Sequence, residues 1–157
     1  MTAPETTTSV PVLEMFDVTL APARDDGAAG VAGIHWCVQP GDYWVAGGLH
    51  GGGKSDLLAT AAGLQRPASG SHWLFGRNTA ELDEDDFLRA RLRVGMVFAD
   101  GGRLFNDLTV VENVALPLRY HADCETTDAA EQAQAVLEWA GVADLARKRA
   151  GQISRGS

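Results

Sequence analysis

The residues with the clearest chemical potential form one glycine-rich stretch in the first half of the chain. Residues 48–55 read Gly-Leu-His-Gly-Gly-Gly-Lys-Ser, which satisfies the spacing G-x-x-x-x-G-K-[ST] of a phosphate-binding loop. Glycines let a backbone curl so that several N–H groups point at one anion. The spacing therefore predicts a loop that binds nucleotide phosphates, and a glycine-rich turn with an incidental lysine is the alternative.

Each residue of this loop has a predicted role. Backbone contacts to the phosphates are expected from the glycines, which are Gly48, Gly51, Gly52 and Gly53. Lys54 is expected to reach the β- and γ-phosphates as a point charge. The Ser55 hydroxyl is the expected ligand of Mg²⁺, which prefers oxygen atoms. Asp56 comes next in the sequence and either repels the triphosphate or faces away as an acidic residue of the first helical turn.

A loop of this kind connects a strand to the N-terminus of a helix. The apolar run Tyr43–Ala46 lies between turn signals just before the loop, and such a run is typical of a buried strand. After the loop, Leu58, Ala61 and Ala62 follow helical spacing and Gly63 supplies a stop. The pattern predicts a helix over residues 55–62.

The other expected elements alternate early in the chain and are helical in its last third. Strands are predicted over 12–20, 31–38, 71–75 and 94–98, with a loop over 21–30. Helices are predicted over 83–92, 127–140 and 142–149, and Thr109 and Glu112 have the spacing of a capping box. This order indicates an α/β fold with a helical appendage.

Composition narrows the possible classes of function. The chain has 157 residues, 45% of them hydrophobic and 22% charged, as in globular proteins. Its net charge of −8 argues against a nucleic-acid partner, which would require a basic face. No apolar run approaches the length of a membrane span, and the first nine residues lack the pattern of a signal peptide. The two cysteines, Cys37 and Cys124, are interpreted as free thiols in a reducing cytoplasm.

Further motifs on both sides of the loop support one family. Residues 33–42 precede it with a predicted strand and a Pro-Gly-Asp turn, and residues 62–70 follow it with a stretch that resembles the pattern L-x-P-x-x-G. A second block comprises residues 94–98, 104–110 and 112–114. Together these segments resemble the ATP-binding subunit of an ABC transporter from about Val12 onwards, and the second block is similar to the Q-loop region of that family. Residues 112–121 most resemble subunits of lipid-trafficking importers.

The resemblance implies a fold and a division of the chain. The implied fold is α/β, an incomplete P-loop NTPase core of the ABC type (RecA-like) with an N-terminal antiparallel β subdomain and a C-terminal helical subdomain. Residues 1–10 are expected to be a disordered tail. Residues 11–100 would form the β subdomain and the P-loop half of the core. Residues 101–157 would follow the Q-loop and form the helical subdomain.

The same resemblance implies partners, cofactors and a location. The chain is expected to bind ATP and Mg²⁺ through residues 48–55 and to couple them to a transmembrane permease subunit docked near residues 105–117. It would pair with a second nucleotide-binding subunit, in a homodimer or heterodimer, and lie in the cytoplasm on the inner face of the membrane. Ser154 and Gly156 match a degenerate signature motif that contacts the nucleotide of the opposing subunit, whereas Arg155 and Ser157 depart from it.

Departures from the family pattern leave a second interpretation open. Ala99 aligns with the Q-loop glutamine, Asp100 is a candidate substitute, and residues 21–30 contain no aromatic residue to stack on adenine. The second acidic motif and the switch histidine are expected beyond Ser157, so this chain alone is expected to hydrolyse little or no ATP. The alternative is a non-hydrolysing subunit with a structural or regulatory role. A small P-loop kinase would need an arginine-rich lid, which Arg89, Arg91 and Arg93 do not form.

Overall fold

The computed structural model describes residues 9–21, 31–98, 104–121 and 125–153. Contacts within the chain divide it into two compact units, residues 1–96 and 97–157, and each is described by itself. Several predictions lie outside the described residues: nearly all of the tail (1–10) and of the loop (21–30), Ala99 and Asp100, and the signature residues Ser154 and Gly156.

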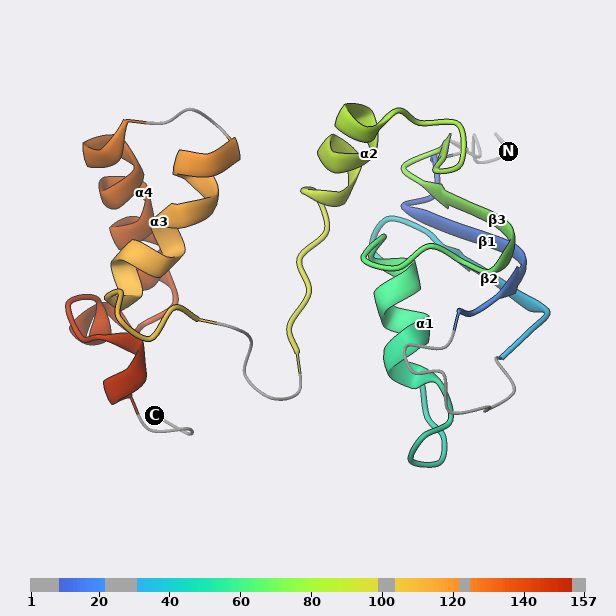
Figure 1. Ribbon diagram of the computed structural model, residues 1–157, viewed down its shortest axis with the longest axis horizontal. Helices are drawn as coiled ribbons and strands as arrows, with labels where there is room; N and C mark the ends of the chain where they lie inside the picture. The colour runs from blue at the N-terminus through green and yellow to red at the C-terminus, as the bar shows by residue number, and fades with distance from the viewer. Residues whose placement is uncertain (1–8, 22–30, 99–103, 122–124, 154–157) are drawn as a thin grey trace, which may run out of the picture. The chain divides into compact units, whose positions relative to one another are not determined.

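The first unit is built on an antiparallel sheet of four strands (Figure 1). Its strands are β1 (Leu13–Thr19), β2 (Ile34–Val38), β3 (Ser69–Leu74) and β4 (Arg77–Asn78), in the spatial order β2-β1-β3-β4. Every neighbouring pair is antiparallel, which confirms the antiparallel β part of the predicted fold. The register of β1 shifts against both neighbours around Asp17, whose φ is 51°, so this strand contains a β-bulge.

Two helices complete the first unit, α1 (Lys54–Ala61) and α2 (Glu84–Arg91). Both were predicted to within one residue at each end. The Asp83 carboxylate caps α2 by accepting a hydrogen bond from the Asp86 amide at 2.8 Å. Acidic side chains in the first turn of α2 and arginines in its last turn complement the helix dipole.

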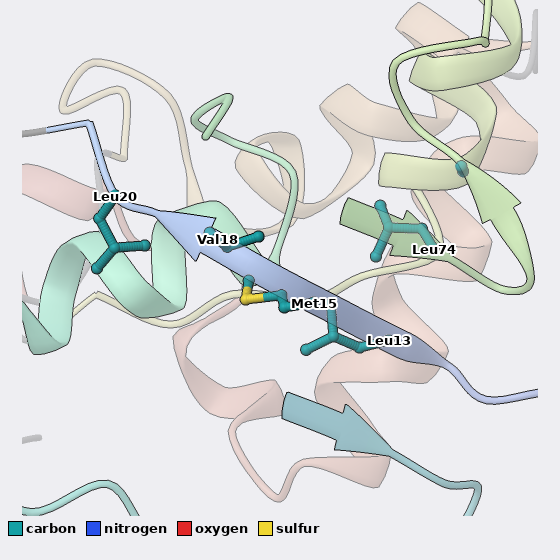
Figure 2. Close-up of a cluster of buried hydrophobic side chains, with 6 residues drawn as sticks. Leu13, Met15, Val18, Leu20 and Leu74 are labelled. Atoms are coloured by element: carbon teal, nitrogen blue, oxygen red, sulfur yellow. The ribbon is translucent and has the colours of Figure 1, made fainter. Parts of the chain in front are cut away.

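The core of this unit lies against the face of the sheet from which Leu13, Met15 and Val18 project (Figure 2). Met15 and Val18 are three residues apart, a spacing that would place them on opposite faces of a regular strand. The bulge adds one residue between them and so returns Val18 to the buried face. Leu74 of β3 joins them, and Leu57 and Ala61 of α1 pack against this cluster. Buried apolar area therefore anchors α1, and with it the loop that precedes α1, to the sheet.

Two predicted strands are absent. Residues 43–46 and 94–98 have no strand conformation, and exposed side chains in them include Val45 at 79% and Val97 at 93%. Such apolar runs become strands when neighbouring strands satisfy their backbone hydrogen bonds. Within the ranges that the structure describes, neither run pairs with a strand. The prediction from hydrophobicity alone was wrong for both.

The second unit is helical. It contains α3 (Val110–His121), α4 (Thr126–Trp139) and two short 3₁₀ turns, η1 (Ala143–Leu145) and η2 (Ala150–Gln152). The capping box is confirmed, because the Thr109 amide donates to Glu112 Oε2 at 2.7 Å and the Glu112 amide donates to Thr109 Oγ1 at 3.3 Å. Ala115 of α3 packs against Ala129 and Ala133 of α4. Among the described residues, no helix is long and apolar enough to cross a membrane.

The predicted helix over residues 142–149 is reduced to the single turn η1. The backbone beyond this turn is used in another way, because Ala146 O and Lys148 O accept hydrogen bonds from the amides of Val111 and Val110 at 3.0 Å. Pairing with the start of α3 thus replaces the helical hydrogen bonds that the sequence pattern predicted.

His72 is a buried titratable group in the middle of β3. It is 2% exposed, and the Thr79 hydroxyl donates to its carbonyl oxygen at 2.9 Å. Because that hydroxyl proton is already used, His72 Nδ1 is the donor in the 3.1 Å contact with Thr79 Oγ1. Burial lowers the pKa of His72, because the charged imidazolium would lose its hydration in the core. The neutral imidazole is therefore the form that the fold stabilises.

We expect the first unit to lose stability as the pH falls below the unfolded-state pKa of histidine, roughly 6.5. Below that pH the unfolded chain binds a proton that the folded chain resists, so the loss continues until the pH reaches the lowered folded-state pKa. The slope is at most about 1.4 kcal/mol per pH unit. Urea unfolding followed by tryptophan fluorescence reports mainly on this unit, because three of the four tryptophans lie in residues 1–96.

His72→Asn keeps a side-chain donor near the Nδ1 position and is expected to remove this pH dependence between pH 7 and 5. His35→Asn, at an exposed position of β2, is the matched control and should retain it. Equal slopes in the wild type and His72→Asn would contradict the prediction.

Candidate phosphate-binding site

The glycine-rich loop is curled, as its sequence predicts. Gly51 and Gly53 have φ values of 76° and 79°, a region that residues with a Cβ atom rarely adopt. The Gly52 amide donates to Leu49 O at 3.1 Å and closes the turn. At Gly53 a Cβ atom would lie 2.8 Å from Val31 Cγ2. Both the backbone angle and the space at Gly53 therefore favour glycine.

The Lys54 side chain folds back into this curl. Its Nζ donates to Gly48 O at 2.9 Å and to Leu49 O at 2.6 Å, and the aliphatic part of the side chain passes close to Gly48. The chain thus places an ammonium group against the backbone of the first two residues of the loop. A cation held there attracts an anion to the concave side of the curl.

The start of α1 supplies unpaired donors beside this ammonium group. Within the described part of the chain, the amides of Lys54, Ser55 and Asp56 have no hydrogen-bond acceptor, as expected for the first turn of a helix. The N-cap residue, Gly53, has no side chain to satisfy them. Free amides at the positive end of the helix dipole form an anion site, and the exposed Ser55 hydroxyl adds an oxygen ligand of the type that Mg²⁺ prefers. These residues fit a magnesium-bound polyphosphate.

The predicted site residues are brought together in one place. Gly48 and residues 51–56 all lie on the curl or on the first turn of α1. Asp56 is partly buried and is the only acidic residue of that turn. His50 is exposed on the loop. Ser154 and Gly156 lie outside the described residues, so their predicted contact with a second subunit remains a prediction.

The sequence-based reasoning did not assign a role to Asn113, which fixes a second loop. Asn113 is 9% exposed; its Oδ1 accepts from the Phe105 amide at 2.8 Å, and its Nδ2 donates to Thr109 O at 2.9 Å. From the other side, the amides of Ala150 and Gly151 donate to Leu108 O and Asn106 O. A buried asparagine is stabilising only when its polar atoms are paired. The feature of the sequence that could have indicated this role was an asparagine within the largely apolar segment of residues 110–118.

The loop that Asn113 fixes carries two exposed apolar side chains. Leu104 is 54% exposed and Phe105 is 63% exposed, although both backbone groups of Phe105 are fixed by Asn113. A large apolar side chain on a restrained backbone loses little further entropy when a partner covers it. The loop over 104–109 therefore has the physical character of a preformed contact surface.

Comparison with known proteins identifies a family and relatives. The family model described as "ABC transporter" matches residues 31–157. The chain is 34% identical over 149 residues to the methionine import ATP-binding protein MetN of Brucella abortus, covering 95% of this chain and 39% of that protein. It is 33% identical over 130 residues to the cell division ATP-binding protein FtsE of Escherichia coli, covering 83% of this chain and 58% of that protein. The chain thus spans less than two thirds of these relatives.

A solved structure shows the same fold. The ATP-binding cassette MJ0796, in a dimeric post-hydrolysis state bound to ADP and phosphate, superimposes with a TM-score of 0.73 at 24% identity. The match covers 90% of this chain and 63% of that one. The predicted fold class, an incomplete cassette of the ABC type, is confirmed by this likeness together with the antiparallel sheet described above.

Proposed function

Because the chain belongs to the ABC transporter family, we propose that it is an ATP-binding subunit of a membrane transporter and binds Mg-ATP through residues 48–55. The observation that carries this proposal is the Lys54 ammonium group folded against the carbonyl oxygens of Gly48 and Leu49, beside amides that have no acceptor within the described ranges. Few arrangements other than a polyphosphate site place so many donors around one curl of backbone.

When the nucleotide binds, the residues of the loop would exchange their hydrogen-bond partners within the chain for phosphate oxygens. The Lys54 ammonium would leave the two carbonyl oxygens and form charge-assisted contacts with the β- and γ-phosphate oxygens. The amides at the start of α1 would donate to the same phosphates. The Ser55 hydroxyl would hold Mg²⁺, which supplies charge neutralisation on the phosphate chain.

The proposal includes a permease partner that docks near residues 105–117. Support comes from the exposed Leu104 and Phe105, presented on a loop whose backbone Asn113 restrains. It also includes a second nucleotide-binding subunit, whose nucleotide Ser154 and Gly156 would contact, and a location at the inner face of the cell membrane. MetN is named as an import protein and MJ0796 as dimeric, which supports these roles by relationship.

A second candidate is a subunit that binds ATP without hydrolysing it. Ala99 favours it, because a methyl group at the position that resembles the Q-loop glutamine can neither bind Mg²⁺ nor orient water. The two candidates differ in phosphate release. Because this chain alone is expected to hydrolyse little or no ATP, the comparison requires an assembly that supplies the second acidic motif and the switch histidine. With Mg-ATP bound in that assembly, steady release of inorganic phosphate supports the hydrolysing subunit, whereas stable binding without release supports the alternative.

The proposal is tested by displacement of a fluorescent ATP analogue from the purified chain. We expect Mg-ATP and Mg-ADP to displace the analogue, and adenosine to do so at least about 100-fold less effectively. The difference corresponds to about 2.7 kcal/mol contributed by the phosphates. Most of the proposed contacts are to phosphate, so the base and ribose alone should bind weakly. Failure of the analogue to bind, or equal displacement by adenosine, would refute phosphate recognition by this loop.

A further inference from the structure

One part of the first unit carries positive charge although the chain as a whole is acidic. The chain has 21 acidic residues against 13 lysines and arginines, yet residues 57–80 and 87–98 contain five arginines and no aspartate or glutamate. The two segments pack together, because a Cβ atom at Gly63 would lie 3.5 Å from Phe87 Cζ and 3.6 Å from Arg91 Cγ. Positive charge is therefore concentrated where these segments meet.

Three of these arginines have no carboxylate partner in the part of the chain that the structure describes. The two ion pairs there join Arg77 and Arg89 to Asp86. The arginines left without such a partner, which we call the arginine patch, are Arg66, Arg91 and Arg93. Their charges are therefore available to an anion from outside the unit.

Aromatic rings hold two members of the arginine patch. Arg66 Cζ lies 5.1 Å from the centroid of the Phe87 ring, and Phe87 and Arg91 lie one turn apart on the same face of α2. Arg93 Cζ lies 3.7 Å from the centroid of the Phe75 ring. Because a stacked guanidinium group uses its face, the N–H donors along its edge stay free for an acceptor. The stacking also restricts the side chain, so less entropy is lost when an anion binds.

Exposed leucines lie beside the arginines in the sequence. Leu64 is 43% exposed and Leu92 is 47% exposed, and each is within two residues of a member of the arginine patch. Apolar groups next to guanidinium groups suit a ligand that carries both carboxylates and apolar side chains. A segment of polypeptide has this chemistry, whereas a free inorganic anion does not.

We propose that the arginine patch is a docking surface for an acidic segment of a partner protein. The guanidinium groups would form charge-assisted hydrogen bonds with carboxylates, and apolar side chains of the segment would cover the two leucines. A membrane of anionic lipids is the other large source of anions. Acidic residues outnumber basic ones in residues 1–96, so such a membrane repels the unit as a whole, whereas a short segment meets only the local positive charge.

The test measures the affinity of the full chain for a fluorescent peptide that repeats Glu-Glu-Leu, by fluorescence anisotropy at low ionic strength. The variant that combines Arg66→Gln, Arg91→Gln and Arg93→Gln is expected to bind this peptide about 10-fold more weakly than the wild type, because each exposed charge pair contributes a factor of roughly 1.5 to 5. A peptide that repeats Gln-Gln-Leu reports binding through leucine alone. It should bind the wild type and the variant equally and weakly.

Two further variants separate a specific surface from a general effect of charge. Arg119→Gln, Arg147→Gln and Arg149→Gln together lower the net charge by the same amount at exposed positions of the second unit. This control should keep the affinity within about 2-fold of the wild type, because distant charges are screened. Replacing the three arginines of the patch by lysine keeps the charge and loses the planar group. The lysine variant should therefore bind with an intermediate affinity.

The outcomes decide between an acidic protein segment and the alternatives. A loss of affinity in the glutamine variant of the patch but not in the control variant supports the proposal. Equal affinity of the wild type and the glutamine variant for the Glu-Glu-Leu peptide overturns it, as does a wild type that does not bind this peptide. Binding to phosphatidylserine vesicles that depends on the patch, without binding to the peptide, would assign the patch to a membrane surface and would also overturn the proposal.

Discussion

Replacing Lys54 by alanine is expected to weaken Mg-ATP binding about 100-fold or more. The ammonium group is the only side-chain cation among residues 47–56, and it already lies against the curl in the free chain, with Nζ 2.6 Å from Leu49 O and 2.9 Å from Gly48 O. Contacts of a charged group are worth about 1.5–3 kcal/mol each. Losing one or two of them corresponds to about one to four powers of ten in affinity. The measurement is displacement of the fluorescent ATP analogue.

The chain offers a matched control for this substitution. Its only other lysine, Lys148, is exposed in the second unit, so Lys148→Ala changes the net charge by the same amount and should leave the affinity unchanged. Lys54→Arg keeps the charge and should retain part of the binding, which separates loss of the cation from loss of the loop. An affinity in Lys54→Ala equal to that of the wild type would overturn the site.

The features that sequence predicted well are those fixed by nearby residues. The helices α1 and α2 and the Thr109–Glu112 capping box each depend on side chains within about one helical turn of the backbone they affect. The curl of residues 48–55 is equally local, because Gly51 and Gly53 permit its positive φ angles. For such elements, the residue types and their spacing along the chain determine most of the local structure.

The features that sequence missed depend on partners far along the chain. Hydrophobicity gave residues 43–46 and 94–98 a preference for burial, but a strand also needs a paired backbone beside it, and the described residues provide none. The role of Asn113 was missed for a related reason. Its hydrogen bonds to Phe105 and Thr109 become visible only when the loop before α3 has folded back against the helix.

Gly70 is the position where a small substitution is expected to cost most stability. It lies in β3 with φ at 88°, and a Cβ atom there would be 2.3 Å from Asp17 O and 2.7 Å from Val18 Cα. These are backbone atoms at the bulge of β1, so rotation of a side chain cannot relieve the overlap. Gly70→Ala would force β1 and β3 apart beside the buried Val18.

We expect Gly70→Ala to lower the free energy of unfolding of the first unit by about 3–5 kcal/mol. Backbone strain contributes roughly 1–3 kcal/mol and steric overlap roughly 1–3 kcal/mol or more. Urea unfolding followed by tryptophan fluorescence measures the loss. Should the variant not fold, hydrogen exchange of the amides in β1 and β3 would show the protection of the whole sheet lost.

Gly41→Ala is the control that divides this loss between its two causes. Gly41 has the same φ of 88°, but a Cβ atom there would meet nothing within 4 Å. The loss in Gly41→Ala therefore measures backbone strain alone, and the additional loss in Gly70→Ala measures the contact with β1. Equal losses in the two variants would mean that the sheet yields at the bulge without cost.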